Sequence, residues 1–522
     1  MSGLLQKERV LQRQSLWLQT LPPAVPWPLA AHKKTEVVIV GAGITGLTAA
    51  YLLLLSGRRV VVVDSGLAGG GDTGHTSAHL TAWADPGYGV IEKKHGKAAA
   101  RLVFQCHLAA MGFMETLINK EKIACDFCRV DGYLCLGENQ ERHVLEREWK
   151  ALQAIGDTSC KQAAWIENSA AGPFRGRPAI RLPSQARFHP LRYLDGLTQA
   201  VLALGGEIYT ATPVSRIEHD GVRTASGFCI QAQYGVIATH SPVAGTLIFL
   251  KQAAYRTYVT AARIPKGSLP DALYWDTEDP YHYVRLEPFS ETEDLVIAGG
   301  YDHKTGQSDE AAYAARYEQL EAWTRRHIEG AGVFEYQWSG QILETIDGLP
   351  YIGRIAHHGL KLYMATGYSG NGLTYGTAAG LILQDLISGQ KSSWTGLFEL
   401  RRKKISAGWN FLKENLNIFQ HWAGDKIKPE ETQDAETLKP GEGAIIQKGL
   451  HKMAAARDKQ GVLRKFSAVC PHLGCIVQWN PAEQTFDCPC HGSRFSGTGR
   501  VIQGPALRDL KNERPDVPRQ AP

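Results

Sequence analysis

The stretch TEVVIVGAGITGLTAAYLLLLSGRRVVVVDSG, residues 35–66, decides the fold of most of the chain. Its order is an apolar β-branched run, a tight glycine turn, a helical pattern and a second apolar run that ends in Asp64. The turn has the spacing GxGxxG, formed by Gly41, Gly43 and Gly46. In such a turn one glycine bends the chain, one lets a pyrophosphate approach the backbone, and one lets helix and strand pack. Because an acid at the end of the second strand accepts ribose hydroxyls, the stretch predicts a dinucleotide-binding domain.

Two other interpretations of this stretch remain open. Its apolar part, residues 37–55, approaches the ~20 residues that span a bilayer, but the glycine turn already explains its pattern. A glycine-rich helix start without a ligand is the second alternative. Residues 1–34 contain an apolar part that prolines interrupt, which suits a secretory signal poorly. We therefore expect a cytoplasmic protein without an integral membrane span.

Length and charge limit the function classes. A chain of 522 residues is too long for one ordinary core and predicts two or three domains. Its 57 basic and 52 acidic residues give a formal net charge of +5. No basic stripe of the kind that neutralises phosphates stands out, so we expect no nucleic-acid partner.

A series of further motifs follows the glycine turn. They are GGGDTGHTSAHLT (69–81), QARFHPLRYLDGL (185–197), YGVIATH (234–240), DGLPYIG (347–353) and ATGYSGNGLTYGTAAG (365–380). The series resembles the D-amino-acid-oxidase-like family of FAD-dependent oxidoreductases, which includes glycine oxidase and sarcosine oxidase, over roughly residues 35–395. The resemblance implies an α/β FAD-binding domain of Rossmann type with an α+β substrate domain built on an antiparallel sheet. The expected FAD-binding parts are 35–87, 185–250 and 345–395, and the expected substrate-domain parts are 88–184 and 251–344.

The resemblance also implies roles for individual residues around FAD. The first glycine loop would hold the pyrophosphate, the segment after it would pass near the isoalloxazine, and the late glycine loop would place a helix N-terminus beside the flavin. These roles fall to Gly41, Gly43, Gly46 and Asp64; to Thr73, Gly74, His75, Thr76 and Ser77; and to Gly367, Gly370, Asn371, Gly372 and Leu373. Backbone N–H groups of the late loop suit the electron-rich edge of reduced flavin even without the family, although an ordinary glycine turn is the alternative. His75 is also a candidate for covalent attachment of FAD, or for plain packing.

Candidate substrate-positioning residues lie in DPYHYVRLE. Strand alternation puts Tyr281, Tyr283 and Arg285 on one face. An arginine beside tyrosines can clamp a carboxylate bidentately, and an exposed strand face with a surface arginine is the alternative. The segment AGGYDHKTG can add Asp302 or His303 to the site.

A second set of ligands lies near the end of the chain, in CPHLGCIVQWNPAEQTFDCPCHGSRF, residues 470–495. Cys470 and His472 form CxH, and Cys488 and His491 form CxxH. Two cysteines on one iron and two histidines on the other are the ligands of a Rieske [2Fe–2S] cluster. A structural zinc site is the competing interpretation, because mixed Cys/His sets also suit zinc.

The same stretch resembles the Rieske proteins of respiratory and photosynthetic cytochrome complexes, over about residues 440–512. The resemblance implies a small all-β domain and a disulfide between Cys475 and Cys490 that ties the cluster loops. Ser493 matches the family serine that bonds a cluster sulfide. Phe495 stands where the family usually has a tyrosine, so one hydrogen bond that raises the potential is missing and we expect an intermediate potential. Cys125 and Cys128 are expected to be buried structural thiols.

Together these motifs predict an enzyme, an FAD-dependent oxidoreductase. It would dehydrogenate an amine or amino acid by hydride transfer to FAD and pass electrons singly through the Rieske cluster to an unidentified one-electron acceptor. The alternative is an electron-transfer or redox-sensing protein that works in the reductive direction. An N-terminal extension (1–34), a basic helix (401–415) with a polar linker inside 396–439, and a tail (513–522) complete the expected organisation.

Overall fold

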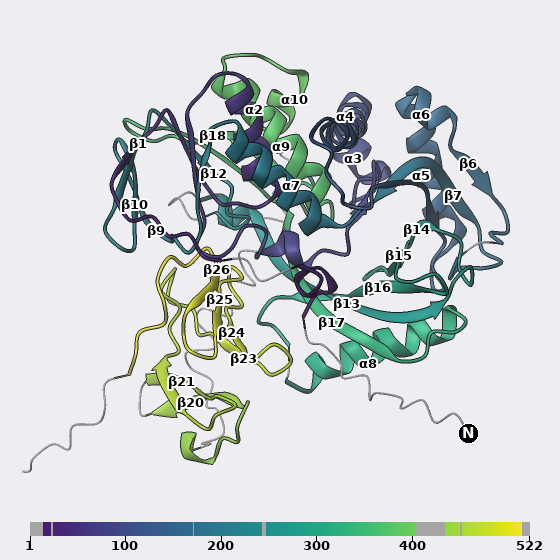
Figure 1. The fold of residues 1–522 in the computed structure, drawn as a ribbon. Helices are drawn as coiled ribbons and strands as arrows, with labels where there is room; N and C mark the ends of the chain where they lie inside the picture. The colour runs from purple at the N-terminus through teal and green to yellow at the C-terminus, as the bar shows by residue number, and fades with distance from the viewer. Residues whose placement is uncertain are drawn as a thin grey trace, which may run out of the picture. The chain divides into compact units, whose positions relative to one another are not determined.

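The computed structural model describes residues 14–21, 25–170, 172–242, 247–308, 310–402, 434–448 and 451–513. The chain divides into two compact units (Figure 1). The first unit comprises 1–240, 255–303 and 316–407; the second comprises 241–254, 304–315 and 408–522. Most of the helix expected at 401–415 and the first part of the linker lie outside the described residues. Two segments of the flavoprotein region, 241–254 and 304–315, therefore belong to the second unit. No sequence motif predicts this division.

The first unit contains the expected Rossmann-type sheet. Its six strands are, in spatial order, β18 (Tyr351–Arg354), β19 (Lys361–Thr366), β12 (Tyr234–Ile237), β2 (Val37–Val40), β3 (Val60–Val63) and β8 (Glu207–Tyr209). All neighbours pair in parallel except β18 and β19. Every residue of β2 and β3 is buried. Burial on both faces explains why these strands are continuous apolar runs instead of alternating ones.

Three helices lie beside this sheet. Helix α2 (Ile44–Leu55) packs against α7 (Pro190–Ala203) and α9 (Gly372–Ile387) (Figure 1). It also contacts β2 and β3. The stretch 37–55 is therefore a strand, a turn and a helix. Among the described residues, the model has no helix that combines the length and the apolar character needed to cross a membrane.

The first unit also contains a large sheet that is mostly antiparallel. Its strand order is β17 (Phe334–Thr345), β13 (Gln252–Pro265), β16 (Glu293–Lys304), β15 (Tyr283–Pro288), β14 (Ala272–Asp276), β5 (Cys128–Cys135), β7 (Ala179–Arg187) and β4 (His79–Leu80), with β6 (Ala164–Ile166) paired to β7. Strands β5 and β14 are parallel, whereas β14, β15 and β16 form an antiparallel run. This sheet is the α+β substrate domain that the resemblance implies.

The second unit is built on two small antiparallel sheets. The first has the order β20 (Gly443–Lys448), β21 (His451–Arg457) and β22 (Leu463–Ser467); the second has the order β23 (Gln478–Asn480), β24 (Thr485–Asp487), β25 (Arg494–Ser496) and β26 (Val501–Gln503). Trp479, Phe486 and Phe495 are buried in its core. The all-β character expected of the C-terminal domain is confirmed.

We predict that Gly46→Ala destabilises the first unit, whereas Gly112→Ala does not. A Cβ on Gly46 would lie 1.9 Å from the carbonyl oxygen of Gly41, so helix and turn must separate. The expected loss is at the upper end of the ~1–3 kcal/mol that overpacking costs. Gly112, in helix α4 (Lys97–Glu121), has no heavy atom within 4 Å of its would-be Cβ. Its replacement is expected to raise stability by up to ~1 kcal/mol. Thermal unfolding followed by circular dichroism checks the pair, and equal midpoints would contradict the argument.

Candidate functional site

The glycine turn between β2 and α2 forms a cradle made of backbone. Gly41 has φ +112°, a conformation that favours glycine, and a Cβ there would lie 2.4 Å from the Ala238 carbonyl oxygen. Asp64, which follows β3, accepts the N–H of Ala42 at 2.7 Å and that of Gly66 at 2.8 Å. Burial raises the pKa of Asp64, although these two hydrogen bonds oppose the shift. Asp64 therefore braces the turn from the next strand.

The start of helix α2 fits the pyrophosphate of FAD. Its N-cap is Gly43, which has no side chain to cap the helix. The nearest atom to a Cβ placed on Gly43 is Thr73 Oγ1 at 3.3 Å, and the N–H of Ile44 points to the same hydroxyl at 3.4 Å. Open backbone N–H groups at a helix N-terminus are the usual site for a phosphate. Gly43 and Thr73 are thus close together, as the resemblance implies.

The late glycine loop leads into α9 in a similar way. Gly367 has φ +80°, and Gly372, the first residue of the helix, meets no heavy atom within 4 Å of a would-be Cβ. The Asn371 side chain does not cap the helix, because its oxygen accepts the N–H of Asp85 at 2.6 Å and its nitrogen donates to the Trp83 carbonyl at 3.0 Å. The N-terminus of α9 therefore keeps its backbone donors for another group, and the loop fits the flavin edge.

The segment 72–77 is fixed largely through its backbone. The carbonyl of His75 accepts the indole N–H of Trp338 at 3.2 Å, and the carbonyl of Thr76 accepts that of Trp17 at 2.7 Å. The His75 ring hydrogen-bonds the Gly71 carbonyl at 2.9 Å. Ser77 pairs with the ring of His79 at 3.1 Å. These contacts set the path of the segment without using the Thr73 hydroxyl.

A cluster of acids and tyrosines lies beside the late loop. Asp85 accepts the Tyr281 hydroxyl at 2.8 Å and the Gly370 N–H at 3.0 Å. The rings of Tyr281 and Tyr283 are 5.7 Å apart, and the Tyr283 hydroxyl pairs with that of Thr257 at 2.8 Å. Tyr281 precedes β15, so the strand alternation assumed from the sequence does not apply to it. The two tyrosines are nevertheless brought together.

Asp302, on β16, belongs to the same cluster. Burial raises its pKa to about 7; hydrogen bonding to the Thr257 hydroxyl opposes the shift, and the nearby carboxylates Asp85 and Asp279 add to it. Its Oδ1 is buried and has no hydrogen-bond partner among the described residues. His303, the other residue named in this segment, stacks on Tyr258 instead, with ring centres 5.6 Å apart. The cluster therefore holds a carboxyl group that titrates near neutrality.

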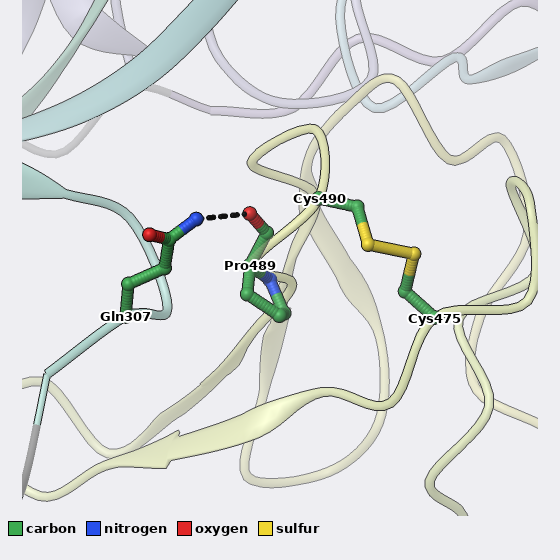
Figure 2. Close-up of a disulfide and its surroundings, with 4 residues drawn as sticks. All are labelled: Gln307, Cys475, Pro489 and Cys490. Atoms are coloured by element: carbon green, nitrogen blue, oxygen red, sulfur yellow. Dashed lines mark hydrogen bonds between the residues drawn. A yellow bond between two sulfur atoms is a disulfide. The ribbon is translucent and has the colours of Figure 1, made fainter. Parts of the chain in front are cut away.

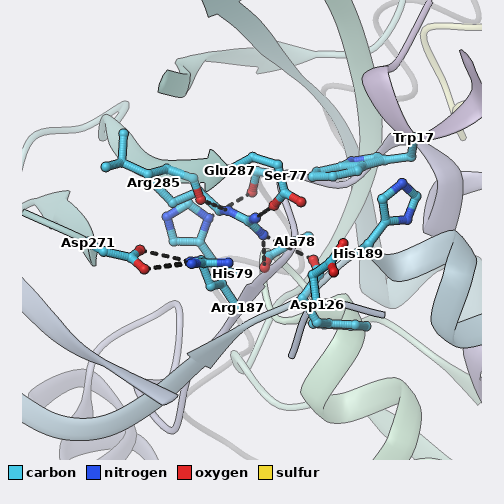
Figure 3. Close-up of polar contacts among 12 residues, drawn as sticks. Trp17, Ser77, Ala78, His79, Asp126, Arg187, His189, Asp271, Arg285 and Glu287 are labelled. Atoms are coloured by element: carbon cyan, nitrogen blue, oxygen red, sulfur yellow. Dashed lines mark hydrogen bonds and ion pairs between the residues drawn. The ribbon is translucent and has the colours of Figure 1, made fainter. Parts of the chain in front are cut away.

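Arg285 occupies a different environment from the one expected. Its side chain has no exposed surface, and it pairs with Glu287 (Figure 3). Its other donors reach three backbone carbonyls, those of Leu286 at 3.1 Å, Ala78 at 2.9 Å and Phe188 at 3.2 Å. Burial lowers the pKa of Arg285 to about 10, while Glu287 opposes the shift. Because Glu287 and backbone carbonyls already accept the hydrogen bonds of the guanidinium, we assign Arg285 a structural role and not the binding of a substrate carboxylate.

The two ligand-bearing loops of the second unit have one backbone pattern. In each, the carbonyl of the first cysteine accepts the N–H of a glycine in the left-handed conformation, and the N–H of that cysteine donates to the residue after the glycine. The residues are Cys470, Gly474 and Cys475 in one loop and Cys488, Gly492 and Ser493 in the other, with bonds of 3.0 and 2.8 Å in both. Two equivalent loops thus present one Cys and one His each.

The four expected ligands form two pairs of like residues. The side chains of Cys470 and Cys488 hydrogen-bond each other, and the rings of His472 and His491 are 5.0 Å apart. Both ring nitrogens of His491 are buried without a hydrogen-bond partner in the described chain. Burial lowers the pKa of His491 to about 3, so the imidazole is neutral, as a metal ligand must be. The set fits a [2Fe–2S] cluster with two thiolates and two imidazoles.

The remaining cysteines of these loops are bonded to each other. Cys475 and Cys490 form a disulfide (Figure 2). The sulfur of Cys488 lies within 4.8 Å of both disulfide sulfurs, but only Cys488 of the three has a thiol that can bind metal.

Other residues named from the sequence lie as follows. The Ser493 hydroxyl accepts the Ala506 N–H at 3.0 Å and also hydrogen-bonds the side chain of Cys470. Phe495 is fully buried. Cys125 and Cys128 are free thiols, the first buried and the second partly so.

The first unit has two glycine-lined helix ends and a buried acid cluster, and the second has a pair of loops with two cysteines and two histidines. This combination defines a flavoprotein oxidoreductase with a Rieske centre. Comparison with known families agrees: residues 36–386 match the FAD dependent oxidoreductase family and residues 430–514 match the Rieske [2Fe-2S] domain. The chain belongs to the FAD-dependent oxidoreductases and carries a C-terminal Rieske domain. Its cofactors are FAD and a [2Fe–2S] cluster.

Similar proteins share this organisation in whole or in part. The Bacillus subtilis (strain 168) protein described as "Putative Rieske 2Fe-2S iron-sulfur protein YhfW" is 31% identical over 94% of this chain and 95% of its own length. Gamma-glutamylputrescine oxidoreductase of Escherichia coli (strain K12) is 24% identical over 72% of this chain and 88% of its own. The crystal structure of glycine oxidase from Geobacillus kaustophilus superposes with a TM-score of 0.60 at 20% identity, covering 71% of this chain and 99% of that one. This last likeness shows the fold.

Sequence reasoning missed Asp85 and Thr257. Neither belongs to a motif, and each enters the acid and tyrosine cluster only because strands and loops distant in the chain meet there. Asp85 interrupts the mostly apolar stretch TAWADPG, and this position was the one feature of the sequence that could have marked it as a candidate site residue.

We predict that Cys488→Ser removes the iron–sulfur cluster but leaves FAD bound. Serine cannot replace a buried thiolate ligand, and Cys488 belongs to the second unit, whereas the glycine cradles belong to the first. Cys229→Ser is the matched control, because Cys229 is a partly buried free thiol on β11 (Cys229–Gln231). Iron analysis, EPR of the dithionite-reduced protein and flavin absorbance give the answer. Retention of a Rieske EPR signal in Cys488→Ser would contradict the ligand assignment.

Proposed function

We propose that the protein dehydrogenates an amine or amino acid and delivers the electrons one at a time to an external acceptor. The observation that carries the proposal is the pair of carboxyl groups, Asp85 and Asp302, gathered with Tyr281 and Tyr283 beside the Gly370 loop. Such a cluster suits a substrate that arrives as an ammonium ion and must leave as an imine. Glycine and γ-glutamylputrescine, named for two of the similar proteins, both carry an amino group.

Proton handling is the part that this chain's residues perform. A substrate ammonium has to lose one proton before the hydrogen of the neighbouring C–H bond can leave as a hydride. Asp302, with a pKa of about 7, is ionised above neutral pH and can take that proton. Asp85 is already the acceptor of the Tyr281 hydroxyl and the Gly370 N–H, so it fixes the tyrosine and the loop. Tyr281 and Tyr283 then orient the neutral amine.

Electron counting supports an external one-electron acceptor. FAD supplies the two-electron acceptor for the hydride, which leaves an imine, while a Rieske cluster takes one electron at a time. Cys470, His472, Cys488 and His491 would hold the cluster, and a bound cluster would allow the two electrons of one oxidation to leave singly. This favours a dehydrogenase over an enzyme that hands both electrons to oxygen.

An anaerobic titration tests the proposal. The purified protein is mixed with pools of amino acids and of secondary and tertiary amines, flavin absorbance is followed, and samples are frozen for EPR. We expect one pool to bleach the flavin and raise a reduced Rieske signal. A Rieske signal with dithionite, but no bleaching by any pool, would reject the amine substrate and favour the reductive direction of electron flow.

We predict that Asp302→Asn lowers kcat/KM by roughly 10²–10⁴-fold, the usual contribution of a general base. In the native protein kcat/KM should rise with pH up to about 7 and then level off, because the ionised carboxyl group is the active form. The variant should lose this rise. Asp220→Asn, at an exposed position next to β10 (Gly221–Thr224), is the control and should keep the native profile. A native pH profile in Asp302→Asn would remove Asp302 from the mechanism.

A further inference from the structure

Two segments of the flavoprotein region belong to the same compact unit as the cluster loops. Residues 241–254 and 304–315 fall inside the stretch 36–386 that matches the FAD-dependent oxidoreductases, yet they group with the C-terminal domain. Phe249, in the short helical turn Leu247–Lys251 of the first segment, contacts the expected ligands. The Rieske module therefore has neighbours that its own sequence does not supply.

Phe249 contacts both histidine ligands at once. Its ring centre lies 5.0 Å from that of His472 and 4.8 Å from that of His491, with interplanar angles of 83° and 85°. The two histidine rings are themselves 5.0 Å apart at 89°. Three rings are thus in mutual edge-to-face contact, an arrangement that aromatic quadrupoles favour. His491 is only 8% exposed, whereas His472 is partly exposed.

The second segment anchors the other cluster loop. Gln307 donates its side-chain N–H to the carbonyl of Pro489 at 3.0 Å (Figure 2). Gly306, with φ +71°, approaches so closely that a Cβ would lie 2.8 Å from the Pro489 nitrogen. The N–H of Thr305 donates to the carbonyl of Ala254 at 2.9 Å, which joins the two segments to each other. The two segments are thus joined to each other, and the second has its own contacts with the Pro489 loop.

We propose that Phe249 is a positioning residue that shields the paired histidine ligands. It keeps water and docking partners from the histidine side of the cluster. An external acceptor then reaches the cluster by another side. The ring acts through His472 and His491 and takes no part in bond making.

Shielding has a consequence for the reduction potential. With two thiolates, two sulfides and neutral imidazoles, an oxidised cluster has no net charge, and one added electron makes it −1. Water stabilises the charged state more than the neutral one, so an apolar cover over the histidines lowers the potential. Removing the cover should raise the potential and expose the ring nitrogens together.

The test compares Phe249→Ala with Phe249→Tyr and Gln307→Ala in the full, cluster-loaded protein. Diethyl pyrocarbonate modification of His472 and His491 in the oxidised state is followed by mass spectrometry, and the cluster potential is followed by EPR-monitored titration. We expect Phe249→Ala to react severalfold faster and to have a higher potential. Phe249→Tyr, which keeps the ring, and Gln307→Ala, which leaves the ring in place, should stay near native values.

Each result decides the matter. Native reactivity and potential in Phe249→Ala would overturn the proposal. An equal rise in Gln307→Ala would assign the shield to the segment as a whole and not to the ring. If Phe249→Ala fails to retain its cluster, Phe249→Val, whose shorter side chain leaves part of the two imidazoles uncovered, replaces it in both measurements, and a native rate and potential in that variant would overturn the proposal.

Discussion

The fold of the flavoprotein unit depends on one close approach, that of Gly46 to the carbonyl oxygen of Gly41. At that contact helix α2 lies directly on the turn that follows β2, with no room for a side chain. The same helix packs against α7 and α9, and α9 begins at the second glycine loop. A shift of α2 would therefore disturb both glycine loops together. The residue type at position 46 thus constrains the two helix ends that suit FAD.

The two cofactor sites use different parts of the chain. The candidate flavin cradle offers backbone N–H groups and glycines that leave space, with Asp64 and Asn371 bracing the loops from outside. The cluster site relies on side chains, which two loops of equal hydrogen-bond pattern present in pairs. A dinucleotide is bound along its length by many weak donors, whereas iron is bound by a few strong ligands. The sequence motifs differ accordingly, in glycine spacing for one and in Cys/His spacing for the other.

The sequence motifs predicted those features that depend on residues close together in the chain. The GxGxxG turn and the ligand loops are contiguous, so their spacing alone predicted a Rossmann-type sheet and a Rieske-like ligand set. Arg285 shows the limit of this kind of prediction. Strand alternation placed Arg285 on one face of the strand, but the alternation could not show that Glu287 and three backbone carbonyls surround its guanidinium. Asp85 and Asp302 come from different parts of the chain and meet only in the folded sheet. Such clusters require tertiary contacts that no spacing in the sequence encodes.

The division into units shows that the Rieske domain is more than an appended module. Its own stretch, 430–514, supplies all four expected ligands and the disulfide. The aromatic contact on both histidines comes from Phe249, and the anchor on the Pro489 loop comes from Gln307, both outside that stretch. A domain joined only by a linker would keep the same ligand geometry without these neighbours. Since the surroundings of a cluster help to tune its potential, residues from the stretch that matches the flavoprotein family lie where they can influence the redox properties of the centre.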